Sequence, residues 1–257
     1  MYFDTHAHYD DLKFDGDRGE LLTALHNSGV GKILNPGCDL KSSELAGQLA
    51  EEYAFVYFAV GIHPEELKDI PENYLSLLAE LAGNKKCLAI GEIGLDYYWD
   101  ASQKELQKEL FFSQLHLAAE LALPVIVHDR EAHGDCMEIV RSAFPAESRT
   151  APGVFHCFSG STEMAEELLK RGWYLGFDGP ITYKNAKKTP EVLQITPLDR
   201  ILIETDSPYL SPVPKRGERN DSGNLRYIAE KIAEIKGETP QHIEEITFEN
   251  ACRLFHL

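Results

Sequence analysis

Short apolar runs alternate with amphipathic stretches along the chain, and this alternation predicts its secondary structure. Near-continuous apolar runs are typical of strands buried on both faces, as in a parallel sheet. Eight such runs predict strands at Tyr2–His8, Val30–Asn35, Ala54–Gly61, Cys87–Gly91, Leu123–His128, Gly153–His156, Trp173–Phe177 and Ile201–Glu204. Apolar residues at helical spacing predict helices at Asp17–Ser28, Lys41–Glu52, Pro71–Ala82, Ser102–Leu121, Glu131–Ala143, Thr162–Arg171, Pro190–Ile195, Asn224–Lys236 and Pro240–Phe255.

This order of elements predicts an α/β fold, a (β/α)8 TIM barrel with a helical C-terminal tail. Alternating strands and helices give parallel strands joined by helical crossovers, and about 250 residues is the usual length of such a barrel. Gly-rich and low-complexity linkers are absent, so we expect residues 1–257 to form a single domain. A doubly wound open sheet is the alternative, although no phosphate loop of the GxxxxGK[ST] or GxGxxG type follows the first run.

The composition narrows the class of partner. The chain has 42 Asp and Glu against 25 Lys and Arg, a formal net charge of -17. This balance disfavours broad wrapping of duplex DNA, which depends on many contacts from Lys and Arg to phosphate, and by itself such charge serves solubility. A phosphate-bearing substrate remains compatible, because bound divalent metal ions supply positive charge locally.

Cysteine usage and hydropathy indicate the cellular compartment of the protein. The five cysteines are scattered without a CxxC pair, which indicates reduced thiols and a cytoplasmic protein. We expect no signal peptide, because the chain starts without a basic segment. No apolar stretch approaches the ~20 residues of a membrane span. No heptad pattern or apolar stripe suggests an obligate protein partner.

The candidate chemistry lies at the ends of the predicted strands. His6 and His8 are at positions i and i+2, so on an extended strand their side chains aim at one point. Four further groups follow other predicted strands: Glu92, His128, His156 and Asp206. In a (β/α)8 barrel the carboxyl ends of all strands meet on one face, where active sites form. We therefore expect these six side chains to be neighbours.

Taken singly, each of these residues has an ordinary interpretation, such as a loop histidine, a turn cap or a solvated acid. Together they place four imidazoles and two carboxylates on one rim, which calls for a compensating cation. Mixed imidazole and carboxylate ligands suit Zn, Mn, Fe or Ni, and carboxylate-rich sites also admit Mg. Six ligands exceed what one catalytic metal uses, so we expect two divalent metal ions sharing a water. Asp206 is positioned to take the proton of that water.

Six motifs resemble those of TatD-related deoxyribonucleases, in the order of that family and over nearly the whole chain. They are Asp4-Thr5-His6-Ala7-His8, Gly61-Ile62-His63-Pro64, Ala89-Ile90-Gly91-Glu92-Ile93-Gly94-Leu95-Asp96-Tyr97, Leu123-Pro124-Val125-Ile126-Val127-His128, His156-Cys157-Phe158-Ser159-Gly160 and Glu204-Thr205-Asp206-Ser207-Pro208-Tyr209-Leu210. The resemblance implies a metal-dependent exonucleolytic DNase with a (β/α)8 barrel. It implies that Glu92 bridges two metals; the first would be bound by His6, His8 and Asp206, the second by His128 and His156.

Three further residues are candidate substrate contacts. The resemblance implies that His63 contacts a substrate phosphate, whereas the ordinary interpretation is a turn histidine before Pro64. Arg216 and Arg219 lie in the irregular segment Ser207–Gly223, which we expect to be an active-site loop. They could contact a phosphate or be ordinary solvated arginines.

Our leading hypothesis is a metal-dependent deoxyribonuclease that acts on DNA ends or single-stranded DNA. The first alternative is a hydrolase of amides, esters or lactones from the amidohydrolase superfamily, including release of an ester-linked residue from tRNA. Many such relatives bridge two metals with a modified lysine after the fourth strand, where this chain has Glu92. The second alternative is a metal-dependent binding module without catalysis.

Overall fold

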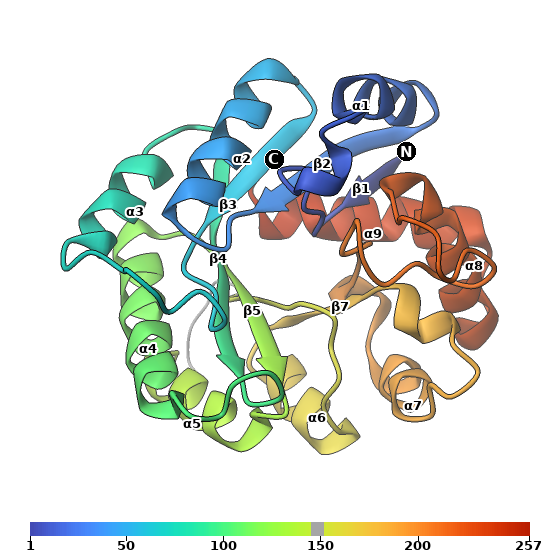
Figure 1. The fold of residues 1–257 in the computed structure, drawn as a ribbon. Helices are drawn as coiled ribbons and strands as arrows, with labels where there is room; N and C mark the ends of the chain where they lie inside the picture. Colours follow the sequence, from blue (N-terminus) through green and yellow to red (C-terminus); the bar gives the residue numbers. More distant parts are fainter. Residues whose placement is uncertain (145–151) are drawn as a thin grey trace.

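The computed structural model describes residues 1–144 and 152–257, and its strands form one parallel eight-stranded sheet (Figure 1). The strands pair in sequence order: β1 (Tyr2–Asp4), β2 (Val30–Pro36), β3 (Val56–Val60), β4 (Cys87–Asp96), β5 (Val125–Arg130), β6 (Gly153–Phe155), β7 (Tyr174–Phe177) and β8 (Ile201–Ile203). The TIM-barrel prediction is confirmed.

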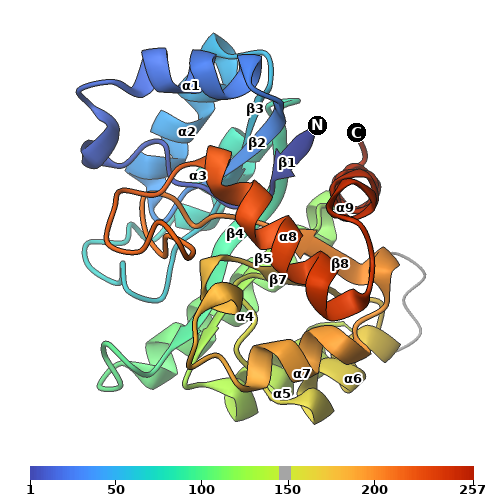
Figure 2. The same cartoon turned by 90° about the vertical axis from the view of Figure 1, so that its right-hand side faces the viewer.

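Helices surround the sheet, one after each strand, as Figures 1 and 2 show. They are α1 (Arg18–Asn27), α2 (Leu40–Glu52), α3 (Tyr74–Ala82), α4 (Lys104–Leu121), α5 (His133–Ala143), α6 (Thr162–Lys170), α7 (Lys188–Ile195), α8 (Leu225–Lys236) and α9 (Pro240–Leu254). The predicted tail needs refinement, since α8 is the eighth helix of the barrel and packs against α7 and β8. The additional helix α9 packs against β1 and β8.

The inside of the barrel has two layers. The lower layer is apolar and receives residues from every strand: Phe3, Leu34, Ala59, Leu88, Ala89, Ile126, Val154, Tyr174 and Leu202, covered by Ala251, Leu254 and Phe255 at the end of the chain. Alternate strand residues share a face, so the next inward positions on β5 and β6 after Ile126 and Val154 are His128 and His156. The polar site therefore sits directly above the apolar layer, at the carboxyl ends of the strands.

The seam between β1 and β8 closes the barrel just beyond the ends of both strands. The backbone N–H of Thr5 donates to Ile203, that of Asp206 donates to His6, and that of His8 donates to Ser207. Ala7 and Ser207 also form an isolated parallel bridge. The closure brings the His6–His8 segment alongside Asp206, although these residues are about two hundred positions apart.

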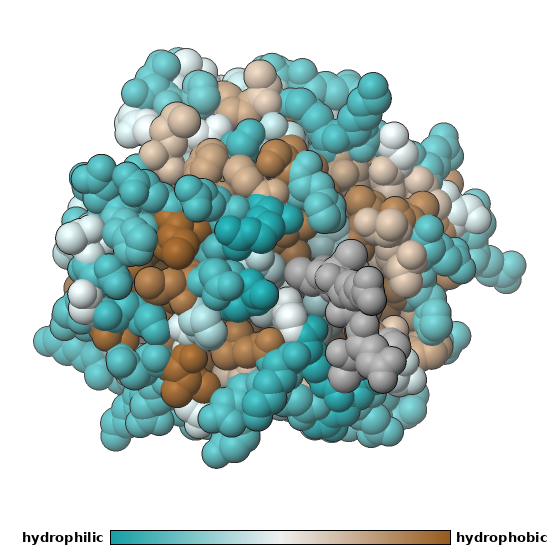
Figure 3. All heavy atoms as spheres, turned by 180° about the vertical axis from the view of Figure 1, so that it is seen from behind, coloured by the Kyte–Doolittle hydropathy of each residue, from teal (hydrophilic) through white to brown (hydrophobic). Residues whose placement is uncertain are grey.

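The surface seen in Figure 3 is largely hydrophilic and the cysteines are unpaired, as the charged composition and the scattered cysteines predict. Hydrophilic side chains cover much of the face seen in Figure 3, with smaller hydrophobic areas between them. All five cysteines are free thiols. Within the residues that the structure describes, none of the helices is long and apolar enough to cross a membrane.

Candidate metal centre

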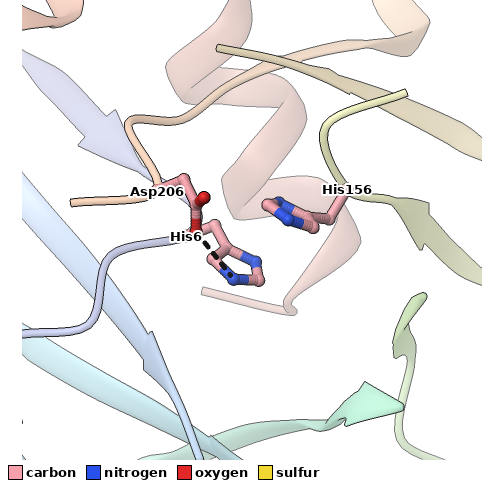
Figure 4. Close-up of side chains that lie close together, drawn as sticks. All are labelled: His6, His156 and Asp206. Atoms are coloured by element: carbon pink, nitrogen blue, oxygen red, sulfur yellow. Dashed lines mark ion pairs between the residues drawn. The ribbon is translucent and has the colours of Figure 1, made fainter. Parts of the chain in front are cut away.

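The first part of the site forms at the barrel seam. The Nε2 atoms of His6 and His8 lie 3.1 Å apart, and that of His6 is 3.1 Å from Glu92 Oε2. Asp206 Oδ1 lies 3.8 Å from His6 Nε2 and 3.5 Å from His8 Nε2. The His6 ring stacks on the His156 ring at 3.6 Å, with Asp206 beside them (Figure 4). The predicted convergence of His6 and His8 is present in the geometry.

The second part of the site surrounds the other oxygen of Glu92. Oε1 lies 2.9 Å from His128 Nδ1, 3.6 Å from His156 Nε2 and 3.5 Å from His63 Nε2. Glu92 is not after β4, as the sequence suggested, but inside it, where the pairing register with β5 shifts between Ile90 and Ile93. The two oxygens of this buried carboxylate thus face two different sets of imidazoles.

The donor set fits divalent metal ions. Within the described ranges 1–144 and 152–257, four combinations of side chains have their donor atoms within 4.8 Å of one another. Three consist only of residues predicted for the site: His6, His156 and Asp206; His6, His8 and Glu92; and His63, Glu92 and His128. Facing nitrogens such as those of His6 and His8 need a shared proton or a cation between them. Imidazole nitrogens and carboxylate oxygens are ligands of Zn, Mn and related ions.

Electrostatic coupling keeps the carboxylates ionised. Burial raises the pKa of Glu92, but the imidazoles of His6, His63 and His156 outweigh it and hold this pKa well below its usual range. Burial likewise acts upward on the pKa of Asp206, and the nearby imidazoles, beginning with His8, bring it below the ordinary value. Both side chains therefore carry a negative charge at neutral pH, as metal binding requires.

The imidazoles of His128 and His156 are correspondingly easy to protonate. Burial acts downward on both pKa values, but Glu204 and Glu92 raise the pKa of His156 to about 10. Hydrogen bonds to Asp96 and Glu92 raise the pKa of His128 to about 9. Without a cation in the site, protons on these rings balance the buried carboxylates.

Two carboxylates that sequence reasoning missed orient these rings from behind. Glu204 Oε1 lies 2.9 Å from His156 Nδ1, and Asp96 Oδ2 lies 3.0 Å from His128 Nε2. Each accepts a hydrogen bond from the outer nitrogen, so the inner nitrogen of His156 or His128, which faces Glu92, is the one that a metal can take in place of its proton. Both acids stand in the quoted motifs, and Glu204 is two residues before Asp206, which was the available signal.

A third missed acid, Asp4, organises the seam. Its buried carboxylate accepts hydrogen bonds from the Thr205 and Ser222 hydroxyls, both at 2.6 Å, and from the Thr205 backbone N–H at 3.0 Å. Burial raises the pKa of Asp4 to about 7, although these hydrogen bonds act to lower it. Asp4 ties the start of the His6–His8 segment to the residue that precedes Asp206.

The three predicted substrate contacts lie in different places. His63 lies at the site, and its Nδ1 accepts the Glu65 backbone N–H at 3.2 Å, so in the neutral ring Nε2 carries the proton and donates toward the site. Arg219 is not at the site; it forms an ion pair with Asp17 and donates to the Lys13 carbonyl. The Arg216 guanidinium stacks on the Tyr183 ring at 3.9 Å.

A parallel eight-stranded barrel with clustered imidazoles and carboxylates at its carboxyl end defines the class of TIM-barrel metal-dependent hydrolases. The family model "TatD related DNase" matches residues 3–256, so the chain belongs to the TatD-related DNase family.

Individual relatives support the same assignment. The uncharacterized metal-dependent hydrolase YabD of Bacillus subtilis is 44% identical, covering 100% of both chains. The 3′-5′ ssDNA/RNA exonuclease TatD of Cronobacter sakazakii is 35% identical, covering 98% of this chain and 97% of that protein. The crystal structure of the TatD homologue YjjV from Escherichia coli matches with a TM-score of 0.91 at 33% identity, covering 100% of this chain and 98% of the other. The chain is thus an enzyme of the metal-dependent hydrolase class.

Proposed function

We propose that this enzyme is a deoxyribonuclease that removes nucleotides from the ends of single-stranded DNA with the help of two divalent metal ions. The observation that carries the proposal is the position of Glu92, whose Oε2 faces His6 and His8 while Oε1 faces His63, His128 and His156. A carboxylate shared in this way is typical of two-metal phosphodiesterases. The relative from Cronobacter sakazakii is named a 3′-5′ ssDNA/RNA exonuclease, and this name supports single-stranded DNA as the substrate.

In this proposal His6, His8 and Asp206 hold one ion, His128 and His156 hold the other, and Glu92 contacts both. Bound Mg, Mn or Zn would lower the pKa of water and polarise a phosphoryl oxygen. The Asp206 carboxylate accepts the proton of the attacking water, because its low pKa keeps it ionised at neutral pH. The Nε2–H of His63 donates a hydrogen bond to a phosphate oxygen of the substrate. Arg219 is left out of this scheme, because its guanidinium pairs with Asp17. Arg216, which stacks on Tyr183, stays a candidate phosphate contact.

An assay with 5′- and 3′-end-labelled single-stranded DNA, in the presence of Mg, Mn or Zn, tests the proposal, together with metal analysis of the purified protein. We expect stepwise shortening from one end and about two metal equivalents per chain. Glu92→Gln combined with Asp206→Asn should abolish cleavage, whereas the surface control Asp199→Asn should not. Intact DNA with every ion, but turnover of an amide, an ester or an aminoacyl-tRNA, would replace the proposal by the first alternative.

We also infer a cytoplasmic location. It rests on the five dispersed free thiols, which are typical of proteins in a reducing compartment. Cell fractionation with an antibody against this chain tests it, and recovery from an oxidising compartment would contradict it.

A further inference from the structure

Two large aromatic side chains stand exposed where β4 leads into α4. Tyr98 and Trp99 are 56% and 64% exposed, and their rings meet edge to face at 4.9 Å. Arg130, the last residue of the neighbouring strand β5, places its guanidinium 4.3 Å from the Tyr98 ring centroid and 5.6 Å from that of Trp99. We call these three side chains the rim cluster. It lies at the carboxyl ends of the strands, the end of the barrel that carries the metal centre.

The rim cluster is fixed to the metal centre through one carboxylate. Asp96 Oδ1 accepts the backbone N–H groups of Tyr98 and Trp99 at 2.8 and 2.9 Å, while its Oδ2 lies 3.0 Å from His128 Nε2. The buried Gln107 side chain accepts the Asp96 N–H and donates to the Asp96 and Asp100 carbonyls. The backbone that carries the two rings is therefore held in place before any ligand arrives, which lowers the entropic cost of binding.

Charge indicates the kind of ligand. Arg130 contacts these two rings and forms no ion pair with any residue in the described ranges 1–144 and 152–257, in a chain whose net charge is -17. By contrast, Arg219 and Arg141 are both paired with carboxylates. The Arg130 cation beside two exposed aromatic side chains complements a ligand that combines an anion with a flat apolar group. An unpaired nucleotide is such a ligand.

We propose that the rim cluster is a base-stacking platform: an unpaired base of the bound strand stacks on Trp99 or Tyr98, and Arg130 contacts an adjacent phosphate. The inference rests on the proposed function and specifies its substrate as unpaired nucleic acid of any sequence, because every base presents a π face to an aromatic ring. Arg130 is two residues beyond His128 on β5, a span of about 7 Å. This is about twice the 3.4 Å rise per nucleotide of a stacked strand, so the base is one or two nucleotides from the reacting phosphate.

Fluorescence tests binding without turnover, because the chain has only two tryptophans and Trp173 is fully buried. We expect a phosphorothioate hexathymidylate to quench the emission of the metal-loaded protein, at concentrations that also inhibit hydrolysis. Trp99→Phe should lose this response. Unchanged emission from the wild-type protein at inhibiting concentrations would overturn the platform.

Steady-state kinetics provide the second test. Trp99→Ala should raise KM for a single-stranded hexanucleotide about tenfold with kcat nearly unchanged, and Trp99→Phe should restore most of the loss. Phe112→Ala is the matched control, because Phe112 is 40% exposed on α4 and packs on His116. All variants should hydrolyse bis(p-nitrophenyl) phosphate with the same kcat, since the substitutions leave the metal centre unchanged.

These readouts separate the two proposals. Cleavage of DNA with an unchanged KM in Trp99→Ala would overturn the platform and leave the nuclease assignment standing. Absence of hydrolysis of both DNA and the small diester would refute the nuclease assignment, and the Trp99 titration would still decide whether the platform binds unpaired nucleic acid. A change of oligomeric state in Trp99→Ala, measured by light scattering, would instead assign the rim cluster to contacts between copies of this chain.

Discussion

At the scale of single residues, the outer carboxylates decide which nitrogen each histidine presents to the site. Glu204 is completely buried, accepts from His156 Nδ1, and also accepts the Cys157 backbone N–H at 2.6 Å. Such partners fix the tautomer and orientation of a metal-binding ring, and replacing them typically costs 10- to 100-fold in metal affinity or activity.

The first prediction concerns Glu204→Gln. Both hydrogen bonds go to Oε1, so the amide oxygen of Gln can still accept them, but the amide carries no negative charge to strengthen the bond from His156 Nδ1 and hold the ring. We expect metal affinity to fall about 10- to 100-fold, measured by competition with a chelating dye. Glu191→Gln on α7 is the control and should bind metal like the wild type. Equal affinity in Glu204→Gln would show that Glu204 does not position His156.

The second prediction concerns the pH dependence of metal binding. The pKa values of His128 and His156 in the metal-free protein are raised to about 9 and about 10. A metal must displace these protons, so apparent affinity should rise with pH until about 10. Calorimetry at pH 7 in buffers of different ionisation enthalpy should detect proton release, with both rings contributing.

The same shifts determine how the metal-free fold responds to pH. A histidine pKa raised on folding contributes stability that is fully present below its unfolded value of about 6.5. That contribution is lost as pH rises through about 9 to 10. In the calorimetry at pH 7 described above, metal binding without proton release would contradict the raised pKa values of His128 and His156.

At the scale of elements, apolar patterning located all eight strands but misjudged the ends of two of them by four or five residues. Strand β1 ends at Asp4 rather than His8, because the backbone N–H of His6 bonds to the Asp4 side chain instead of a neighbouring strand. Strand β4 continues to Asp96 rather than ending at Gly91. A buried Glu92 interrupts the apolar pattern without ending the strand, and only its imidazole partners, far away in sequence, explain why it is tolerated.

The third prediction uses a strand residue that leaves room for the site. A Cβ on Gly176 in β7 would lie 2.5 Å from Glu204 Oε2, which is too close for any real contact. Gly176→Ala should therefore displace the Glu204 carboxylate and reduce metal affinity, although the change adds only one methyl group. Gly134→Ala on α5 is the control, because nothing lies within 4 Å of its added Cβ. Metal titration with both variants provides the measurement, and wild-type affinity in Gly176→Ala would contradict the prediction.

At the scale of the whole molecule, the rule that carboxyl ends of barrel strands converge made the site predictable from sequence. From the sequence alone, it places His6, Glu92 and Asp206 in one set. The same rule does not predict which side chains pair with one another. It therefore does not predict that Asp96 links His128 to the rim cluster. Nor could it foresee that Arg219 pairs with Asp17 instead of facing the site.

The fourth prediction follows from the apolar layer beneath the site, which α9 and the residue after it seal. Phe255 is 2% exposed, and its ring centroid lies 6.0 Å from that of Phe3 in β1. Phe255→Ala should lower the free energy of unfolding by about 3–5 kcal/mol, the usual cost of removing a buried phenyl ring. Leu257→Ala, at a position 45% exposed, should cost far less.

Urea unfolding of both variants measures the difference. Because the polar site is built one layer above, on the seam and on β4 to β6, folded Phe255→Ala should bind metal with wild-type stoichiometry. Added metal should then raise its unfolding midpoint, since ligand binding to the native state stabilises that state. A variant that stays folded but no longer binds metal would show that α9 shapes the site itself, and that the two layers of the barrel interior are coupled.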